Sequence, residues 1–245
     1  MLYGEQAARD NIRNRAGRRV IYLDEGDRLT PAARDFLRRE NIEILPAAEA
    51  RPALYHTADG RTLPEKPEHM THLRGNTLVS KTAPVIAFRG AMDTLQARLL
   101  LTQLEAPPAL RRELGQVLEL SRSILRWEVM EEPAEGEGLC GLTWEQLRLR
   151  SQQPQRFYGQ PHFMPEAGDG KMLLLVNLCR CTAREAELAA ARAFDDGSGG
   201  CTRPDLLRFL NRMSSMLYIL MLRLRAEGNG GARHVHNSDT DGNSH

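Results

Sequence analysis

Apolar residues recur at helical spacing through most of the chain after residue 84. The clearest stretch follows Thr202-Arg203-Pro204, where apolar positions step by four and three over five turns. This spacing puts an apolar stripe on one side of a helix and predicts a packed bundle helix. The positions in the stripe are Leu206, Leu210, Met213, Leu217, Leu220 and Leu224.

Three further segments show the same stepping, at residues 86–104, after Pro107-Pro108, and at residues 170–194. A Thr-x-x-Gln capping box at Thr143–Gln146 predicts a short fifth helix. The pattern therefore predicts a mainly α fold, a four- or five-helix bundle. The inward positions of these segments are Phe88, Met92, Leu95 and Leu99, then Leu110, Leu114, Val117, Ser121 and Ile124, then Met172, Leu175, Cys179, Ala183, Ala186 and Ala190.

The first 75 residues have a different pattern. Short apolar runs at residues 19–23 and 42–45 flank a helix that begins with the cap Thr30 and with Pro31, which predicts a β-α-β piece. Residues 46–75 carry repeated Pro and Gly and are expected to form a connecting loop. The sequence from Gly228 has almost nothing to bury and is expected to be disordered. The expected parts are 1–75, an α/β appendage with its loop, 76–227, the helical bundle, and 228–245, the tail.

Composition narrows the class of protein. Lys and Arg number 33 against 32 Asp and Glu, so the chain lacks the positive excess typical of nucleic-acid binders. The longest apolar runs are far shorter than the ~20 residues of a membrane span, and the N-terminus has no apolar signal region. Four cysteines make no disulfide framework. A cytoplasmic protein with reduced thiols is expected, without nucleic-acid or membrane partners.

Polar residues share one face of the segment 170–194. Asn177, Arg180, Arg184 and Glu187 lie at offsets of 0, 3, 7 and 10 residues. They form either a solvated face with ion pairs or a site where arginines bind a polyphosphate or a partner carboxylate. Asp93 offers such a carboxylate, or a simple surface pair with Arg89 one turn before it. Asn211 and Ser215 lie beside the apolar stripe of the last helix, where a satisfied bundle amide is the alternative.

Histidines and cysteines give little support for a metal site. His56, His69 and His72 have no cysteine or spaced carboxylate near them, so ordinary loop histidines are favoured. Cys179 and Cys181 would point to different sides of one helix, and His234 with His236 would bind metal only adventitiously. No Gly-rich nucleotide-binding motif occurs, although Lys81 and Thr82 have side chains suited to phosphates. No metal site is predicted.

Four segments resemble motifs of the ATP:cob(I)alamin (corrinoid) adenosyltransferases. Residues 177–187 resemble the family's HxARTVCRRAER helix, and Phe209–Ser214 resembles FLNRLSD. Phe163-Met-Pro165 is similar to FILPGG, and Gly90–Asp93 to GTVDEL. The order is that of the family over residues 76–226. Leu29–Arg34, Met70–Leu73 and Arg203–Leu206 resemble the ethanolamine-utilisation branch.

The resemblance implies a five-helix bundle, usually trimeric, that binds ATP and a corrinoid at a subunit interface. The implied reaction is attack of a Co(I) corrinoid on the 5′-carbon of ATP, with Mg²⁺, to make adenosylcobalamin. By motif position, Arg180 would pair with Asp93 of the partner subunit, Phe163 would lie below the corrin ring, and these three residues form the expected catalytic set. Arg184 and Asn211 would contact ATP, and Glu187 would orient the arginines. Lys81, Thr82, Arg89 and Asn177 complete the expected binding residues.

The chain departs from the family's pattern at several positions. Leu78–Thr82 stands where the family has its Gly-rich TRTGDKG loop, and Pro165–Gly168 replaces PGG. Ser215 replaces an Asp, and Glu185 and Leu188 replace basic residues. Some members of the ethanolamine branch carry a His and Cys metal site before the THL stretch. Here Lys66–His69 has no cysteine, so a metal-free version is expected.

The resemblance also implies partners. They are a cob(II)alamin reductant and, through ethanolamine utilisation, ethanolamine ammonia-lyase or the shell of a bacterial microcompartment. The cytoplasm, or the inside of such a compartment, is the expected location. A second hypothesis is a non-catalytic protein that binds, delivers or scaffolds adenosylcobalamin. The missing Gly-rich loop favours this second hypothesis, whereas retention of both helix arginines, Asp93, Asn211 and Phe163 favours the enzyme.

Overall fold

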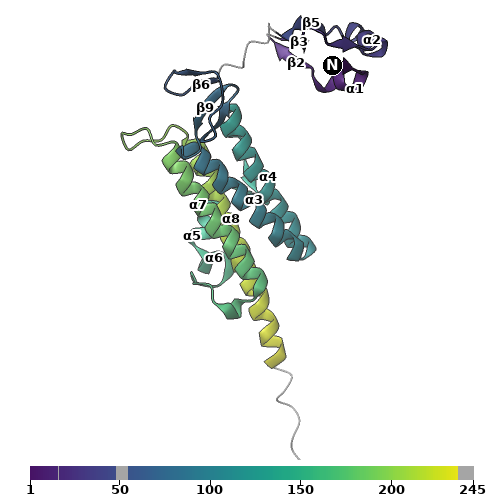
Figure 1. Cartoon of the computed structure of the whole chain (residues 1–245). Helices are drawn as coiled ribbons and strands as arrows, with labels where there is room; N and C mark the ends of the chain where they lie inside the picture. Colours follow the sequence, from purple (N-terminus) through teal and green to yellow (C-terminus); the bar gives the residue numbers. More distant parts are fainter. Residues whose placement is uncertain (16, 48–54, 237–245) are drawn as a thin grey trace, which may run out of the picture. The chain divides into compact units, whose positions relative to one another are not determined.

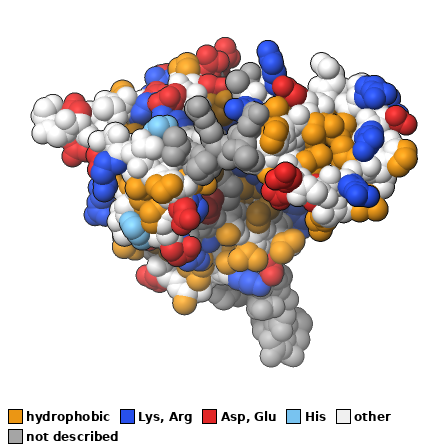
Figure 2. All heavy atoms as spheres, turned by 45° about the horizontal axis from the view of Figure 1, so that its top comes forward, with side chains coloured by type: hydrophobic (Ala, Val, Ile, Leu, Met, Phe, Trp, Pro, Cys, Tyr) orange, Lys and Arg blue, Asp and Glu red, His pale blue; other side chains and the backbone are white. Residues whose placement is uncertain are grey.

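The computed structural model describes residues 1–15, 17–47 and 55–236. Contacts divide the chain into two units, Met1–Val79 and Ser80–His245, a boundary four residues beyond the one expected at 75/76. The larger unit is helical, and both units are drawn in Figure 1. Among the described residues, no helix combines the length and hydrophobicity that a membrane span requires. Positive and negative side chains are interspersed on the face in Figure 2, in keeping with the balanced composition.

Four long helices build most of the larger unit. They are α3 (Pro84–Glu105), α4 (Pro108–Met130), α7 (Lys171–Ala193) and α8 (Pro204–His236). Proline at the start of α3, α4 and α8 suits the first helical turn, where its missing N–H has no partner to lose. Helix α7 packs against both α3 and α8, and α4 packs against the same two helices. The arrangement is visible in Figure 1.

Short elements connect α4 to α7. They are β10 (Gly138–Leu139), β11 (Leu142–Thr143), α5 (Trp144–Gln152), α6 (Pro154–Tyr158) and the 3-10 turn η2 (Ala167–Asp169). The predicted capping box of α5 is confirmed: Thr143 Oγ1 accepts from the Gln146 N–H at 3.2 Å, and Gln146 Oε1 accepts from the Thr143 N–H at 3.0 Å. Trp144 of α5 packs on Phe209 of α8 with ring centroids 4.7 Å apart. This contact fixes α5 against α8.

The core follows the predicted stripes closely. All the predicted apolar positions of α3 and α4 are buried, as are those of α8 up to Leu220. The prediction for α7 is wrong in its first two turns, where Leu173 and Val176 are buried instead of Met172 and Leu175. Several apolar residues are adjacent there, so the spacing alone does not fix the phase of the helix. From Cys179 onward the predicted positions are the buried ones.

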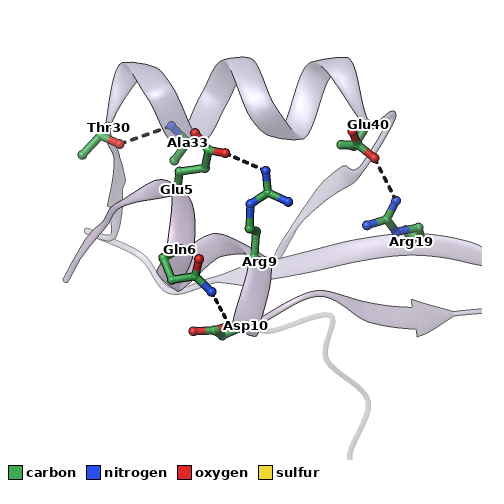
Figure 3. Close-up of polar contacts among 8 residues, drawn as sticks. All are labelled: Glu5, Gln6, Arg9, Asp10, Arg19, Thr30, Ala33 and Glu40. Atoms are coloured by element: carbon green, nitrogen blue, oxygen red, sulfur yellow. Dashed lines mark hydrogen bonds and ion pairs between the residues drawn. The ribbon is translucent and has the colours of Figure 1, made fainter.

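The smaller unit contains a β-α-β segment. Strands β3 (Arg18–Leu23) and β5 (Glu43–Pro46) are parallel, with Ile21 opposite Ile44, and α2 (Pro31–Arg39) lies between them in sequence. Thr30 Oγ1 accepts from the Ala33 N–H at 3.2 Å and caps α2, as shown in Figure 3. The neighbouring elements are α1 (Glu5–Asp10), β1 (Leu2–Tyr3), β2 (Arg13–Arg15) and β4 (Arg28–Leu29).

The loop expected at residues 46–75 contains strands, and that prediction is wrong. Strands β6 (Tyr55–Thr57), β7 (Thr62–Leu63), β8 (Met70–Arg74) and β9 (Thr77–Ser80) form one sheet in the order β7-β6-β9-β8. Gly75, at φ +50°, supplies the left-handed turn between β8 and β9. Strands of two to five residues show almost no period, so their Pro and Gly neighbours dominate the pattern. Residues 48–54 of this segment lie outside the described residues.

The expected disordered tail also needs correction at its start. Helix α8 continues past Gly228 to His236. An established helix gains one hydrogen bond for each further residue, and no proline interrupts this stretch. Residues 237–245, and the side chains of His234 and His236, lie outside the described part of the chain.

Candidate functional site

One side of the middle of α8 is polar, while most of the residues between its members are buried. At ~100° per residue, the five residues on this side fall within a sector of about 120° around the helix axis. Each is half-buried or exposed, whereas residues 213, 214, 216 and 217 between them are buried. We call this set the polar face of α8. It consists of Arg208, Asn211, Arg212, Ser215 and Tyr218.

Asn211 joins α8 to α7 through one hydrogen bond and accepts a second from its neighbour on α8. Its side-chain amide donates to Glu187 Oε1 at 3.0 Å, and its carbonyl oxygen accepts from Arg212 Nη1 at 2.5 Å. Both capacities of the amide are thereby used inside the chain. The structure thus brings the predicted residues Asn211 and Glu187 together, while their expected roles toward ATP and the arginines stay predictions.

Tyr218, seven residues further along α8, contacts two of the other predicted residues, Arg180 and Phe163. The Arg180 guanidinium lies 5.5 Å from the centroid of the Tyr218 ring, and the Phe163 ring stacks at 6.0 Å. Arg180 also donates to Asn177 Oδ1 at 3.3 Å. Seven residues of helix span ~10 Å, so Tyr218 lies about two turns from Asn211.

Phe163 lies in the segment between α6 and η2 and is half-buried. Arg225 places its guanidinium 4.1 Å from the centroid of the Phe163 ring. Asp169 holds that guanidinium through an ion pair of 3.5 Å. A cation over an aromatic face is attracted by the ring quadrupole. Phe163 is thus fixed by Tyr218 and by the Arg225–Asp169 pair.

His162 completes this aromatic group. Its ring stacks on Tyr218 with centroids 5.8 Å apart, and Nδ1 lies 3.1 Å from the Tyr218 hydroxyl. Sequence reasoning missed His162, Arg225 and Tyr218. The signal for Tyr218 was present, because it follows Asn211 and Ser215 at steps of four and three.

Asp93 and Arg184 are both exposed. Neither makes a hydrogen bond or an ion pair among the described residues. The alternative of a surface pair between Arg89 and Asp93 is wrong. Arg89 Nε and Nη2 donate to the two oxygens of Glu128 at 2.7 and 3.0 Å. Glu128 is 1% exposed, and a buried carboxylate requires a countercharge far more than exposed Asp93 does.

Lys81 and Thr82 lie in the turn before α3. Thr82 Oγ1 is 2.7 Å from Ser80 Oγ, and the Thr82 N–H donates to that same oxygen at 3.2 Å. Phe88, in the second turn of α3, packs on Phe194 just after α7 with centroids 5.6 Å apart. Lys81 and Thr82 therefore lie toward the C-terminal end of α7, and both are exposed.

Thiols and imidazoles are dispersed. In residues 1–15, 17–47 and 55–236, no group of three His, Cys, Asp or Glu is placed to hold a metal ion. Cys179 is buried, with Sγ 3.2 Å from Thr102 Oγ1, whereas Cys181 Sγ lies 3.9 Å from Asn177 Oδ1. Burial raises the pKa of Cys140 to about 12, with Glu113 adding to the effect. The metal-free form stays a prediction.

Comparison with known proteins identifies the family. The model of the cobalamin adenosyltransferase family matches residues 62–224, which is most of the chain. The chain belongs to the cobalamin adenosyltransferase family. This match covers all four motifs and every expected site residue.

Similar proteins of the family come from enteric bacteria. The corrinoid adenosyltransferases EutT of Salmonella typhimurium and of Escherichia coli K12 are each 29% identical over 82% of this chain and 84% of their own. Two solved variants of a PduO-type ATP:corrinoid adenosyltransferase from Lactobacillus reuteri, both complexed with cobalamin and ATP, are also similar. They are 19% and 20% identical, with TM-scores of 0.47 and 0.48, over 66% of this chain and 90% and 87% of theirs.

Proposed function

We propose that this chain is a corrinoid adenosyltransferase of the ethanolamine-utilisation type. It transfers the 5′-deoxyadenosyl group of ATP to the cobalt of a Co(I) corrinoid and makes adenosylcobalamin. The observation that carries the proposal is that four of the predicted site residues lie along the line where α7 meets α8. Phe163 and Arg180 meet at Tyr218, and the Asn211–Glu187 bond lies about two turns away. The family match and the EutT relatives support the same activity.

The reaction is a substitution at the 5′-carbon. The electron pair of Co(I) forms the cobalt–carbon bond, and the carbon–oxygen bond to the phosphate chain breaks. Its electron pair leaves with the phosphate oxygen, so negative charge develops on the leaving group. Arginines held in place before the reaction stabilise that charge. Mg²⁺ enters as part of the ATP substrate.

Phe163 is proposed to lie below the corrin ring. A Co(II) corrinoid is hard to reduce while a base or water coordinates its lower face, and an apolar ring there excludes that ligand. Removing the ligand raises the reduction potential of the cobalt, in the same way that axial ligands set the potential of haem iron. Tyr218 and Arg225 hold the Phe163 ring in position. For the ring to meet a corrin, the Arg225 guanidinium must yield the face that it covers.

A homotrimer is proposed as the active form. Asp93 has no partner within the described chain, and an exposed carboxylate on α3 can reach Arg180 in a partner subunit. Exposed leucines on the outer sides of α3 and α7 offer an apolar contact surface, a feature typical of interfaces. They are Leu100, Leu101, Leu104, Leu178 and Leu188. A hollow of about 600 Å³ beside Asn177 and Leu178 lies on the same side of α7.

Arg184, Lys81 and Thr82 stay in the proposed binding set for ATP because all three are exposed. Arg89 is proposed as a structural partner of Glu128 instead. A cob(II)alamin reductant, ethanolamine ammonia-lyase and a microcompartment shell are proposed partners, and the cytoplasm or such a compartment is the proposed location.

A non-catalytic protein that binds or delivers adenosylcobalamin is the second candidate. The turn before α3 favours it, because residues 78–82 contain no glycine that would let a backbone cradle phosphates. The two candidates differ in one observable. A carrier binds adenosylcobalamin without making it, whereas the transferase consumes ATP.

The test is direct. Chemically reduced cobalamin is incubated anaerobically with the protein, ATP and Mg²⁺, and the absorption spectrum is followed for adenosylcobalamin. Product in proportion to enzyme and time supports the transferase. Tight binding of adenosylcobalamin with no product under any reductant supports the carrier and contradicts the proposal. Adenosine in place of ATP is the control, since it offers no phosphate leaving group.

A further inference from the structure

A histidine lies directly before Phe163 and connects two helices. The His162 ring is exposed, yet both of its nitrogens lie close to groups of the chain. Nε2 lies 3.3 Å from the backbone oxygen of Gln152, the last residue of α5, and Nδ1 lies 3.1 Å from the hydroxyl of Tyr218 on α8. Water satisfies an exposed imidazole, so these contacts are not needed to offset burial. They hold the His162 ring between α5 and α8.

The two contacts also determine which nitrogen carries the proton. A backbone carbonyl only accepts hydrogen bonds, so Nε2 of the neutral imidazole donates to Gln152. Nδ1 is then the acceptor, and the Tyr218 hydroxyl donates to it. The two rings stack as well, with centroids 5.8 Å apart and an interplanar angle of 12°. A directed hydrogen bond and a ring contact together restrict the orientation of the Tyr218 ring.

The orientation of the Tyr218 ring matters because that ring contacts two proposed catalytic residues. Phe163 stacks on it at 6.0 Å with an interplanar angle of 26°, and the Arg180 guanidinium lies 5.5 Å from its centroid. Neither contact is a hydrogen bond, so each depends on where the Tyr218 ring lies. Phe163 also belongs to residues 161–166, which form no helix or strand. Side-chain contacts therefore fix its position.

We propose that His162 is a positioning residue of the reaction and that it acts through Tyr218. Its hydrogen bond orients the Tyr218 ring, and the Tyr218 ring in turn places Phe163 and Arg180. This inference rests on the proposed function, in which Phe163 excludes the lower ligand of the cobalt. In this role His162 touches neither substrate. Loss of its hydrogen bond loosens the Phe163 ring, and exclusion of the lower ligand becomes incomplete.

The test measures the coordination of cobalt before any turnover. The full chain is mixed anaerobically with Co(II) cobalamin, ATP and Mg²⁺, and the four-coordinate fraction is measured from the spectrum. His162→Phe keeps a ring that can stack on Tyr218 but removes the acceptor, and Tyr218→Phe removes the donor of the same bond. Tyr158→Phe is the matched control, because Tyr158 is also half-buried and its hydroxyl is hydrogen-bonded to Arg150 instead.

Loss of one hydrogen bond predicts that the ratio of four-coordinate to ligand-bound Co(II) falls about fivefold in each single variant. The double variant His162→Phe, Tyr218→Phe should fall by the same factor and not by the product of the two, because both changes remove one bond. Activity from Co(II) and a reductant falls in parallel, whereas activity from supplied Co(I) stays close to that of the wild type. Tyr158→Phe matches the wild type in every measurement.

An unchanged ratio in His162→Phe overturns the positioning role, as does the same fall in Tyr158→Phe. Losses that multiply in the double variant, or equal losses from Co(I) and from Co(II), also overturn it. Adenosylcobalamin formation by the wild type is assayed separately. A wild type that forms four-coordinate Co(II) but no product contradicts the proposed function, and the variant spectra still decide the role of His162. A wild type that makes product from Co(I) but never forms four-coordinate Co(II) overturns the positioning role and upholds the transferase.

Discussion

Replacing Phe163 with alanine separates a structural role from a catalytic one. The Phe163 ring is half-buried. Its loss removes an offset stack with the Tyr218 ring and a cation–π contact with the Arg225 guanidinium. These are worth about 0.5–1.5 and about 0.5–1 kcal/mol. The expected destabilisation is therefore about 2 kcal/mol. For a unit of this size, that lowers the melting temperature by about 4–8 °C.

Two assays then distinguish the roles. When Co(I) corrinoid is supplied, the nucleophile already exists and no lower ligand has to be excluded, so much of the activity survives. When Co(II) corrinoid and a reductant are supplied, the chain must first exclude that ligand. We expect the second activity to fall at least tenfold further than the first, a difference of about 1.4 kcal/mol in barrier. The four-coordinate Co(II) spectrum with ATP disappears as well.

Phe157→Ala is the matched control. Phe157 is also half-buried, and Arg150 and Arg156 lie 5.5 and 5.2 Å from its ring centroid. Its loss should destabilise to a similar extent and lower both activities equally. Equal losses in the two assays for Phe163→Ala, at a temperature where both variants are folded, refute the placement of Phe163 below the corrin.

Three further changes test the surrounding structure. Glu128→Gln should destabilise the fold by about 3–5 kcal/mol in thermal unfolding, because it removes the buried negative charge that pairs with Arg89, while the KM for ATP stays unchanged. A raised KM with normal stability would return Arg89 to the ATP site. Burial alone would raise the pKa of Asp205, but hydrogen bonds from Arg203 and from two backbone N–H groups outweigh it and lower the pKa to about 2. The ionised carboxylate therefore stabilises the folded state fully above pH ~4, and this stabilisation disappears as the pH falls toward 2. Asp205→Asn should flatten the profile of stability against pH in that window, and an unaltered profile contradicts the assignment. Asp93→Asn and Arg180→Ala should each raise the KM for cobalamin, and normal turnover at limiting cobalamin would exclude the pairing between subunits.

Local periodicity explains why most of the helical core was predictable. Buried positions recur every turn, so the spacing of Leu206 and Leu210 predicts the buried side of α8 even when the neighbouring helices are unknown. The same argument fails at the start of α7, where consecutive apolar residues leave two phases equally good. It also fails for β6 and β8. Each of these strands pairs with β9, which comes after both in the sequence, and strands this short have too few positions to show alternation.

The sequence also did not predict contacts between residues that are far apart in the chain. Arg89 has Asp93 within one turn, and only the packing of α3 on α4 brings Glu128, 39 residues away, within 2.7 Å. Tyr218 likewise becomes a candidate site residue only through its contacts with Phe163 and Arg180, which belong to other segments. Helical spacing placed each residue on a face, but it cannot state which faces meet.

The order of groups along α8 has a chemical consequence. Substitution at a saturated carbon requires the nucleophile and the leaving group on opposite sides of that carbon. The aromatic group at Tyr218 is proposed to lie beside the corrin, and the Asn211–Glu187 pair is proposed to lie beside ATP, ~10 Å away along the same helix. The 5′-carbon then lies between these two positions. Substrates held at these two positions would be oriented for in-line attack, so that orientation would lower part of the barrier before any bond changes.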